Sequence, residues 1–485
     1  MEDVQRFTAA LRKYFPYTPT PGQDALLHAL ARFTYSKMPR CTLVVKGYAG
    51  TGKTTVVGAY VSALRLSGYD IVLLAPTGRA AKVLSQYAKR PAFTIHKKIY
   101  FPSKNASGGM AYGLGVNRHK RTIFLVDEAS MIGGSSGMSS EQAFQYRDIL
   151  EDLIEYVFQG EDCRLVLVGD QAQLPPVGSD ESPALDVEAL RSGFYLTIAD
   201  IQLTDVVRQE MDSGILHNAT SLRKAITSGT EGFPRLEPQG FDDVIPVSGE
   251  DLEEVLEQLY SKYTREGVML ITRSNKRANQ FNQHIRSRIM WFEEELNAGD
   301  MLMVVKNNYH WLNSYKDAPT NFIANGDIVE VVKVVRHHEI YSRRFADVEV
   351  RLIDYPDFLS FEVRILLDTL TVDGPNLSMA EIKALYHDIT EDYLDLGDRK
   401  KIHKAVMEDP FYNALQVKFA YAVTCHKSQG GQWPAIVVDQ GYITEEMLDV
   451  SLLRWFYTAF TRAQQEIYLL NFHPEFFGEM GEAPD

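Results

Sequence analysis

The sequence of 485 residues contains only three cysteines and no apolar run that approaches a membrane span. Cys41, Cys163 and Cys425 are odd in number, far apart and without zinc-ligand spacing, so we expect reduced thiols and neither a disulfide framework nor a zinc site. A membrane-spanning helix needs about 20 consecutive apolar residues, and the first residues lack a secretory pattern. These absences favour an intracellular protein of the reducing cytoplasm with no membrane partner.

The sequence also has fewer basic than acidic residues. It contains 50 Lys and Arg and 64 Asp and Glu, which gives a net charge of -14. Such a charge repels a polyanion at long range, but binding depends on the local field around a groove and not on the sum. Much of the acid lies in helical-looking segments, at residues 141–162 and 250–257, where it can face solvent. The balance therefore predicts modest, salt-sensitive affinity for a nucleic acid. The length predicts three or four domains.

A complete phosphate-binding loop, GYAGTGKT, runs from Gly47 to Thr54. It follows the apolar run Thr42 to Val45 and precedes an amphipathic helical pattern, which is the strand, loop and helix context that this motif requires. Its glycines let backbone N–H groups point at phosphate oxygens, and the helix N-terminus adds a positive dipole end. We expect Lys53 to reach the β- and γ-phosphates and Thr54 to offer its hydroxyl to Mg²⁺. The predicted nucleotide-binding residues of the loop are Gly50, Thr51, Gly52, Lys53, Thr54 and Thr55.

Two further strand-like runs end in residues suited to a triphosphate site. The run Thr122 to Val126 ends in Asp127 and Glu128, and Arg164 to Val168 leads into Gly169, Asp170 and Gln173. Ligands gather at the carboxyl ends of parallel strands, so these groups should converge on the phosphate-binding loop. We expect Asp127 to hold Mg²⁺, Glu128 to accept a proton from the attacking water, and Gln173 to sense the γ-phosphate.

Nine segments resemble the motifs of superfamily 1 helicases in both sequence and order. They resemble in particular those of the RecD-like and Dda-like group, which moves 5′ to 3′ on single-stranded DNA. The resemblance spans about residues 18 to 472. The segments are Thr20 to Gln23 (TPGQ), Ala75 to Lys82 (APTGRAAK), Thr94 to Lys97 (TIHK), Val126 to Met131, Leu167 to Gly178 (LVGDQAQLPPVG), Leu203 to Gln209 (LTDVVRQ), Ile271 to Asn275 (ITRSN), Val423 to Gly430 (VTCHKSQG) and Tyr457 to Ala463 (YTAFTRA).

This resemblance implies an α/β fold with two RecA-like P-loop lobes built on parallel sheets. We expect the first lobe at residues 1–200, the second at 201–299 and 414–485, and an SH3-like barrel with a helical extension at 300–413. Strands alternate with helical runs up to about residue 200, and short strands follow one another from 301 to 367, which supports a parallel sheet and a small barrel respectively. The second lobe is expected to begin near Tyr195, and residues 417–423 are expected to form one strand.

The resemblance also implies roles for individual residues around the nucleotide. Gln23 would read adenine, and Arg208 and Arg462 would bring positive charge to the γ-phosphate, for which the planar guanidinium is well suited. Some relatives place an aromatic residue just before the first of these arginines to stack on adenine. Val207 occupies that position here, so adenine packing must come from elsewhere.

The resemblance also implies DNA contacts on both lobes. In such contacts, polar and cationic groups hold phosphates, while prolines and aromatic faces pack on bases of any identity. The candidates are Pro76, Thr77, Lys82, His96 and Lys97 on the first lobe and Thr424, His426 and Lys427 on the second. The segment from Phe101 to Asn117, within a predicted insertion at residues 100–120, is either a flexible loop or a small hairpin whose apolar residues Phe101, Met110 and Tyr112 separate the strands as a wedge.

Together these patterns predict a monomeric, ATP- and Mg²⁺-dependent translocase and helicase that acts on single-stranded and fork DNA. Three features resemble those of the 5′-to-3′ group: the sequence from His426 to Gly430, the turn from Asn325 to Asp327, and the short first-lobe insertion. Two alternatives stay open. An RNA-directed superfamily 1 helicase uses similar phosphate contacts, and a nucleotide-gated DNA-binding or remodelling ATPase would hydrolyse ATP without separating strands.

Overall fold

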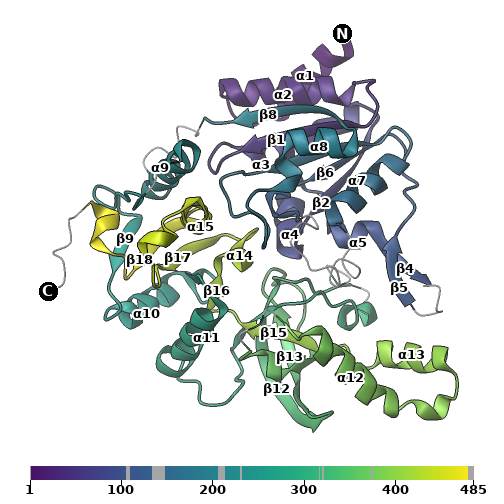
Figure 1. The fold of residues 1–485 in the computed structure, drawn as a ribbon, viewed down its shortest axis with the longest axis vertical. Helices are drawn as coiled ribbons and strands as arrows, with labels where there is room; N and C mark the ends of the chain where they lie inside the picture. The colour runs from purple at the N-terminus through teal and green to yellow at the C-terminus, as the bar shows by residue number, and fades with distance from the viewer. Residues whose placement is uncertain are drawn as a thin grey trace.

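The computed structural model describes residues 2–104, 110–133, 148–205, 213–229, 232–315, 317–318, 322–372, 374 and 376–478, with the backbone alone for residues 102–104, 110–112 and 313. Three bodies are visible in Figure 1: two α/β lobes built on separate sheets, and a β-barrel that carries a pair of helices. Within the described residues, no helix is both long and apolar enough to cross a membrane. All three cysteines are free, as expected, and all three are buried.

The first sheet has six parallel strands in the order β3-β2-β6-β7-β1-β8. They are β1 (Cys41–Gly47), β2 (Asp70–Ala75), β3 (Ala92–Thr94), β6 (Thr122–Val126), β7 (Arg164–Gly169) and β8 (Thr197–Leu203). The central strands β6 and β7 are buried along their whole length, which is why they read as continuous apolar runs. Strand β8 pairs with β1, so the expectation that the second lobe begins near Tyr195 is wrong.

Helices cover both faces of this sheet. They are α1 (Glu2–Tyr14), α2 (Pro21–Thr34), α3 (Lys53–Ala63), α4 (Gly78–Ala88), α5 (Ile95–Ile99), α7 (Ile149–Gln159) and α8 (Val187–Phe194). Two cores result, one between the sheet and α1 to α4 and one between the sheet and α5, α7 and α8. Between α5 and β6 the chain forms the antiparallel pair β4 (Tyr100–Lys104) and β5 (Met110–Leu114), so the hairpin alternative describes this backbone better than a loop.

The second sheet has five parallel strands in the order β16-β10-β17-β18-β9. Its strands are β9 (Val244–Val247), β10 (Val268–Thr272), β16 (Ala422–Thr424), β17 (Trp433–Asp439) and β18 (Ala463–Leu470). The helices of this lobe are α9 (Gly214–Ser228), α10 (Leu252–Tyr263), α11 (Asn275–His284), α14 (Cys425–Ser428) and α15 (Val450–Phe460). Two parallel sheets with crossover helices are the predicted α/β class.

Five strands close the barrel in the order β11-β12-β13-β14-β15. They are β11 (Met301–Val304), β12 (Ile328–Ile340), β13 (Arg343–Leu352), β14 (Phe361–Leu366) and β15 (Leu415–Phe419), and the helices α12 (Met379–Glu391) and α13 (Arg399–Glu408) lie between the last two. The single strand predicted at residues 417–423 is wrong. Its first part closes the barrel as β15 and its last part, β16, begins at Ala422 in the second sheet, so the barrel extends past residue 413.

Candidate functional site

The phosphate-binding loop joins β1 to α3 and is shaped by glycines in the left-handed conformation. Gly50 has a φ of 71° and Gly52 a φ of 79°. Gly47 lies against Lys53, because a Cβ added at Gly47 would be 2.8 Å from the Lys53 Cγ. The Lys53 ammonium donates to the carbonyls of Gly47 (2.6 Å) and Tyr48 (2.9 Å). The loop thus wraps a cation at a helix N-terminus, an arrangement that suits a phosphate chain.

Gln23 ties the start of α2 to this loop. Its side-chain N–H donates to the carbonyl of Thr51 (3.0 Å), and its carbonyl oxygen accepts from the backbone N–H of Thr20 (3.0 Å). The hydroxyl of Thr20 caps the helix in return, which completes a capping box. Backbone groups therefore bind both the N–H and the oxygen of the buried Gln23 amide. Recognition of adenine by Gln23 stays a prediction.

The predicted metal ligands lie on neighbouring elements at the same edge of the sheet. Thr54 and Thr55 lie in the first turn of α3, and the Thr54 side chain is exposed. Asp127 follows β6, where its carboxylate accepts hydrogen bonds from the Tyr87 hydroxyl and from the backbone N–H of Glu128. A hydroxyl and a carboxylate at this edge form a donor set that fits Mg²⁺, which prefers few protein ligands and keeps most of its waters.

Glu128 occupies a strained and electrostatically crowded position. Its φ is 52°, in the left-handed region that non-glycine residues rarely adopt, and such strain is concentrated at functional sites. Burial, followed by the charge of Asp127, raises the pKa of Glu128, while the positive charges of Arg462 and Lys53 oppose that rise. Burial likewise raises the pKa of Asp127. The carboxylate of Glu128 thus lies within reach of cations from both lobes.

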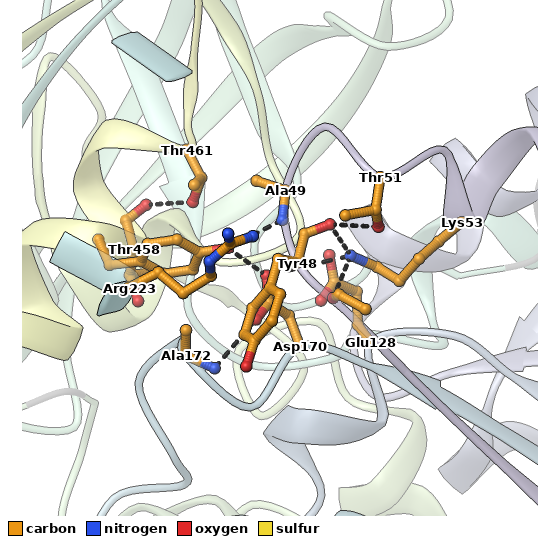
Figure 2. A network of polar contacts seen from close by, with 12 residues as sticks. Tyr48, Ala49, Thr51, Lys53, Glu128, Asp170, Ala172, Arg223, Thr458 and Thr461 are labelled. Carbon is orange, nitrogen blue, oxygen red and sulfur yellow. Dashed lines mark hydrogen bonds and ion pairs between the residues drawn. The ribbon is translucent and has the colours of Figure 1, made fainter. Parts of the chain in front are cut away.

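Asp170, at the end of β7, connects the phosphate-binding loop to the second lobe. Its carboxylate accepts a hydrogen bond from the hydroxyl of Tyr457 on α15 (2.7 Å) and lies 4.0 Å from the Lys53 ammonium. The same Tyr457 hydroxyl accepts from the backbone N–H of Ala49 in the loop (2.8 Å). Figure 2 shows Lys53, Glu128 and Asp170 of the first lobe grouped in this network with residues of the second.

The segment after Asp170 makes a further set of contacts between the lobes. The backbone N–H of Leu174 donates to the Thr458 hydroxyl (2.8 Å), and its carbonyl accepts from the side chain of Gln429 (2.9 Å). Gln173 is buried, and its side-chain oxygen lacks a hydrogen-bond partner within the described part of the chain. An unpaired buried acceptor is costly, so Gln173 remains a candidate for contact with a ligand.

Arg462 lies between the lobes and is 4% exposed. Its guanidinium donates to the carbonyls of Thr458 (3.1 Å) and Gly431 (3.2 Å) and to the hydroxyl of Thr461 (3.0 Å). These bonds orient it from the second lobe, and its charge acts on Glu128 of the first. The other predicted arginine, Arg208, lies with Val207 outside the described residues.

Two residues of this network are absent from the predicted site. Tyr457 is the first residue of the predicted segment YTAFTRA. The sequence therefore placed Tyr457 in a motif but did not predict that it bridges to the first lobe. Arg223 on α9 places its guanidinium 4.4 Å from the ring centre of Tyr48 in the phosphate-binding loop (Figure 2). No motif contains Arg223, and only the fold brings it to the loop.

The predicted DNA-contact segments of the two lobes meet around Gly430. Thr77 caps α4 by accepting from the N–H of Ala80 (3.2 Å). A Cβ added at Gly430, which has a φ of 73°, would be 3.0 Å from the Ala80 Cβ and 3.4 Å from the Thr77 hydroxyl. Gly430, which follows α14, therefore packs directly on the start of α4, so these DNA-contact segments of the two lobes lie next to each other.

The remaining predicted DNA contacts occupy different environments. Pro76, Lys97 and Lys427 are half-buried, Thr424 is buried at the end of β16, and His96 and His426 are exposed. Burial, with a smaller effect from Lys418, lowers the pKa of Lys427 to about 8. Lys82 is paired with two carboxylates of the barrel, Asp327 and Asp354.

The predicted wedge corresponds to the β4–β5 hairpin. Phe101 pairs with Gly113 near its base and packs on Gly115, where an added Cβ would lie 2.2 Å from the Phe101 ring. Phe101 is 48% exposed and lies near the base of the hairpin. The side chains of Met110 and Tyr112 lie outside the described part of the chain, so their predicted role is untested.

Comparison with known protein families gives two matches along the chain. A model described as an AAA domain matches residues 20–241, which include the first sheet and the phosphate-binding loop. A model described as the UvrD-like helicase C-terminal domain matches residues 419–470, which include β16, β17 and α15. The matches thus fall on the two lobes that meet at the site, and neither includes the barrel strands β11 to β14.

Similar proteins extend over most of the chain at low identity. The ATP-dependent RecD2 DNA helicase of Deinococcus radiodurans is 23% identical over 441 residues, which is 88% of this chain but only 46% of that protein. The ATP-dependent DNA helicase dda of Enterobacteria phage T4 is 22% identical over 475 residues, which is 93% of this chain and 98% of that protein. The crystal structure of a Bacteroides Pif1 helicase with ADP-AlF3 and ssDNA has a TM-score of 0.48 at 14% identity and covers 94% of this chain and 92% of its own.

Proposed function

We propose that the chain is a superfamily 1 helicase of the RecD-like and Dda-like group, an ATP-driven motor that moves 5′ to 3′ along single-stranded DNA and unwinds duplex DNA. One observation carries the proposal. The hydroxyl of Tyr457, on the second lobe, joins the N–H of Ala49 and the carboxylate of Asp170 within the nucleotide site of the first lobe. A change in the phosphate-binding loop would therefore be transmitted to the second lobe through this hydroxyl.

In the proposed reaction, water attacks the γ-phosphorus of ATP, the bond from that phosphorus to the β–γ bridging oxygen breaks, and the products are ADP and inorganic phosphate. Lys53 holds the phosphates, and Thr54 and Asp127 would hold Mg²⁺, which when bound neutralises charge on the phosphate oxygens. Glu128 accepts the proton of the attacking water. Arg462, oriented by three hydrogen bonds from its own lobe, contributes positive charge where negative charge develops on the γ-phosphate.

Hydrolysis then changes the contacts that keep the lobes together. The bridge at Tyr457 and the two hydrogen bonds of Leu174 connect the nucleotide site to α15 and to the segment from His426 to Gly430. Because that segment and α4 carry the predicted DNA contacts, a movement of one lobe would displace one half of the proposed strand groove relative to the other. Repeated cycles would move a strand through the groove. We propose that one chain suffices as the motor and that fork DNA is its substrate.

Strand-displacement assays test this proposal directly. Duplexes with a 5′ DNA tail, a 3′ DNA tail or a 5′ RNA tail would be compared beside ATP hydrolysis with single-stranded DNA, and a Lys53→Ala variant would serve as the inactive control. Unwinding from the 5′ DNA tail alone is expected. Unwinding from only the 3′ tail would reverse the polarity, preference for RNA would identify an RNA helicase, and hydrolysis without unwinding would identify a remodelling ATPase.

A further inference from the structure

An ion-pair cluster links the first lobe to the barrel. We call it the Lys82 cluster and define it as Lys82, Asp327 and Asp354. The Lys82 ammonium lies 3.0 Å from the Asp327 carboxylate and 3.3 Å from that of Asp354. The side chains are 12%, 1% and 25% exposed respectively. Lys82 is a predicted DNA contact, yet in this arrangement its charge is satisfied by the protein itself.

The barrel supplies one of these carboxylates on a tightly built turn. Gly326 has a φ of 91°, as the third residue of a type II turn requires, and the N–H of Asp327 donates to the Ala324 carbonyl (3.0 Å). The Asp327 side chain accepts from the N–H of Ala324 (2.9 Å). The turn packs directly on α4, since a Cβ added at Gly78 would lie 1.9 Å from the Ala324 Cβ. Only glycine at position 78 permits this approach.

The same surface covers a second predicted DNA contact. The Lys82 ammonium lies 4.4 Å from the ring centre of Tyr355, and the Lys97 ammonium lies 4.6 Å from that of Phe322. A cavity of about 230 Å³ remains between the two bodies, and its lining includes both lysines and both rings. The barrel thus covers the two first-lobe lysines that the sequence assigns to strand phosphates.

The electrostatics of the Lys82 cluster favour a strong ion pair whose carboxylates a DNA phosphate could replace. Burial alone would lower the pKa of Lys82, but Asp327 and Asp354 outweigh it and raise that pKa. Burial raises the pKa of Asp327, and the charge of Lys82 opposes that rise. A cation held by two carboxylate groups in a poorly solvated site offers the same partner chemistry that a phosphodiester oxygen needs.

We propose that Asp327 and Asp354 act as phosphate mimics at Lys82, so that the barrel closes the first-lobe part of the strand groove until DNA displaces it. This inference rests on the proposed function, because it concerns the same groove. A protein that must first open binds its ligand more weakly by the fraction of molecules that are open. Weakening the cluster should therefore strengthen strand binding.

The Asp354→Asn variant tests this prediction, with Asp327→Asn as a second variant. Asp368 provides a matched control, because it is also a barrel carboxylate of 25% exposure paired with a cation, Arg344, at 3.0 Å. Binding of a fluorescent oligo(dT) would be measured without nucleotide. We expect Asp354→Asn to bind about three- to tenfold more tightly than the parent, Asp368→Asn to change little, and Lys82→Ala to eliminate the gain when combined with Asp354→Asn.

A Gly78→Ala variant opens the same contact without changing charge, because its Cβ would meet Ala324. It should also bind oligo(dT) more tightly. Unchanged or weaker binding by Asp354→Asn, or an equal gain in Asp368→Asn, would overturn the phosphate-mimic proposal. A parent protein that neither binds oligo(dT) nor hydrolyses ATP with it would instead overturn the proposed function, so the two failures are distinct.

Discussion

The hydroxyl of Tyr457 donates a hydrogen bond of 2.7 Å to the carboxylate of Asp170, although the two residues are 287 positions apart in the chain. Burial, followed by the charge of Asp170, raises the pKa of Tyr457 well above its ordinary value, so the hydroxyl keeps its proton and remains a donor. Asp170 also faces Lys53, and Tyr457 also accepts from Ala49. The Tyr457 hydroxyl therefore contacts the backbone of the phosphate-binding loop directly and the Lys53 ammonium through Asp170.

Replacing this phenol tests whether the bridge couples the lobes. Tyr457→Phe keeps the buried ring but removes two hydrogen bonds, each contributing about 1 kcal/mol to stability. We expect a folded protein whose ATP hydrolysis responds much less to single-stranded DNA, measured as the ratio of rates with and without oligo(dT). Tyr468→Phe, which removes a 3.3 Å bond to Glu466 within the second lobe, is the control. A parental ratio in Tyr457→Phe would show that the bridge is structural only.

The catalytic assignment gives a second prediction. Glu128→Gln keeps the size of the side chain but cannot accept a proton, so ATP should still bind while hydrolysis slows by a factor on the order of 10² or more. Nucleotide binding would be followed with a fluorescent ATP analogue, and hydrolysis by phosphate release. Lys53→Ala should lose turnover as well. Full activity in Glu128→Gln would remove this residue from the role of base.

Local patterns in the sequence were sufficient for the nucleotide site. The strand and loop at Thr42 to Thr54 and the strand ends at Asp127 and Asp170 depend on short-range signals, namely continuous apolar runs followed by glycine or acid. The structure brings these ends together as expected. The individual catalytic roles stay predictions.

The sequence did not predict contacts between residues that are far apart in the chain. The run from Val417 to Val423 is uniformly strand-like, so nothing in it marks Ala420 and Tyr421 as the point where the chain leaves the barrel for the second sheet. Strand β8 has a mixed pattern of exposure, and its membership of the first sheet depends on pairing with β1. The partners of Lys82 likewise lie 245 and 272 positions away, on turns of the barrel.

The junction between the barrel and the second sheet supplies a prediction about stability. Asp300, fully buried, accepts from the Arg286 guanidinium at 2.8 Å and 2.9 Å and from the Tyr421 hydroxyl at 3.1 Å. Removing one partner of a buried pair leaves an uncompensated charge, which costs about 3 to 5 kcal/mol. Asp300→Ala should therefore lower the unfolding midpoint in urea strongly.

The control for Asp300→Ala is Asp368→Asn, whose partner Arg344 is 46% exposed. A pair of this kind contributes about 1 kcal/mol or less, so this variant should unfold close to the parental midpoint. Similar midpoints for Asp300→Ala and the control would show that the junction does not depend on the buried pair.

A pH dependence follows from Lys427, whose pKa is lowered to about 8 by burial and then by Lys418. A base with a lowered pKa is protonated below that value and neutral above it. If Lys427 holds a strand phosphate, oligo(dT) affinity should fall as the pH rises from 7 to 9. Lys427→Arg stays charged across this range and should flatten the profile. Coincident pH profiles for the parent and Lys427→Arg would exclude Lys427 from the strand contact.

The β4–β5 hairpin gives the last prediction, because it is fixed at its base and projects from the first lobe beside α5 (Figure 1). The Tyr100 hydroxyl donates to Asp152 (2.7 Å), the N–H of Gly115 donates to the Ile99 carbonyl (2.8 Å), and Phe101 packs on Gly115. An isolated hairpin is marginally stable, so this anchoring is what would let it resist a duplex. Unstacking one base step costs on the order of a few kcal/mol, which an ATP cycle can offset.

Replacing residues 103–112 with a short Gly-Ser linker removes the outer hairpin and leaves that base intact. If the hairpin separates the strands, this variant should keep DNA-stimulated ATP hydrolysis and translocation on single strands but lose duplex unwinding. Phe101→Ala should reduce unwinding partially, because it loosens the base of the hairpin. Tyr17→Ala, which removes a 63% exposed aromatic residue just before α2, is the control. Parental unwinding by the linker variant would mean that the hairpin is only a connector between α5 and β6.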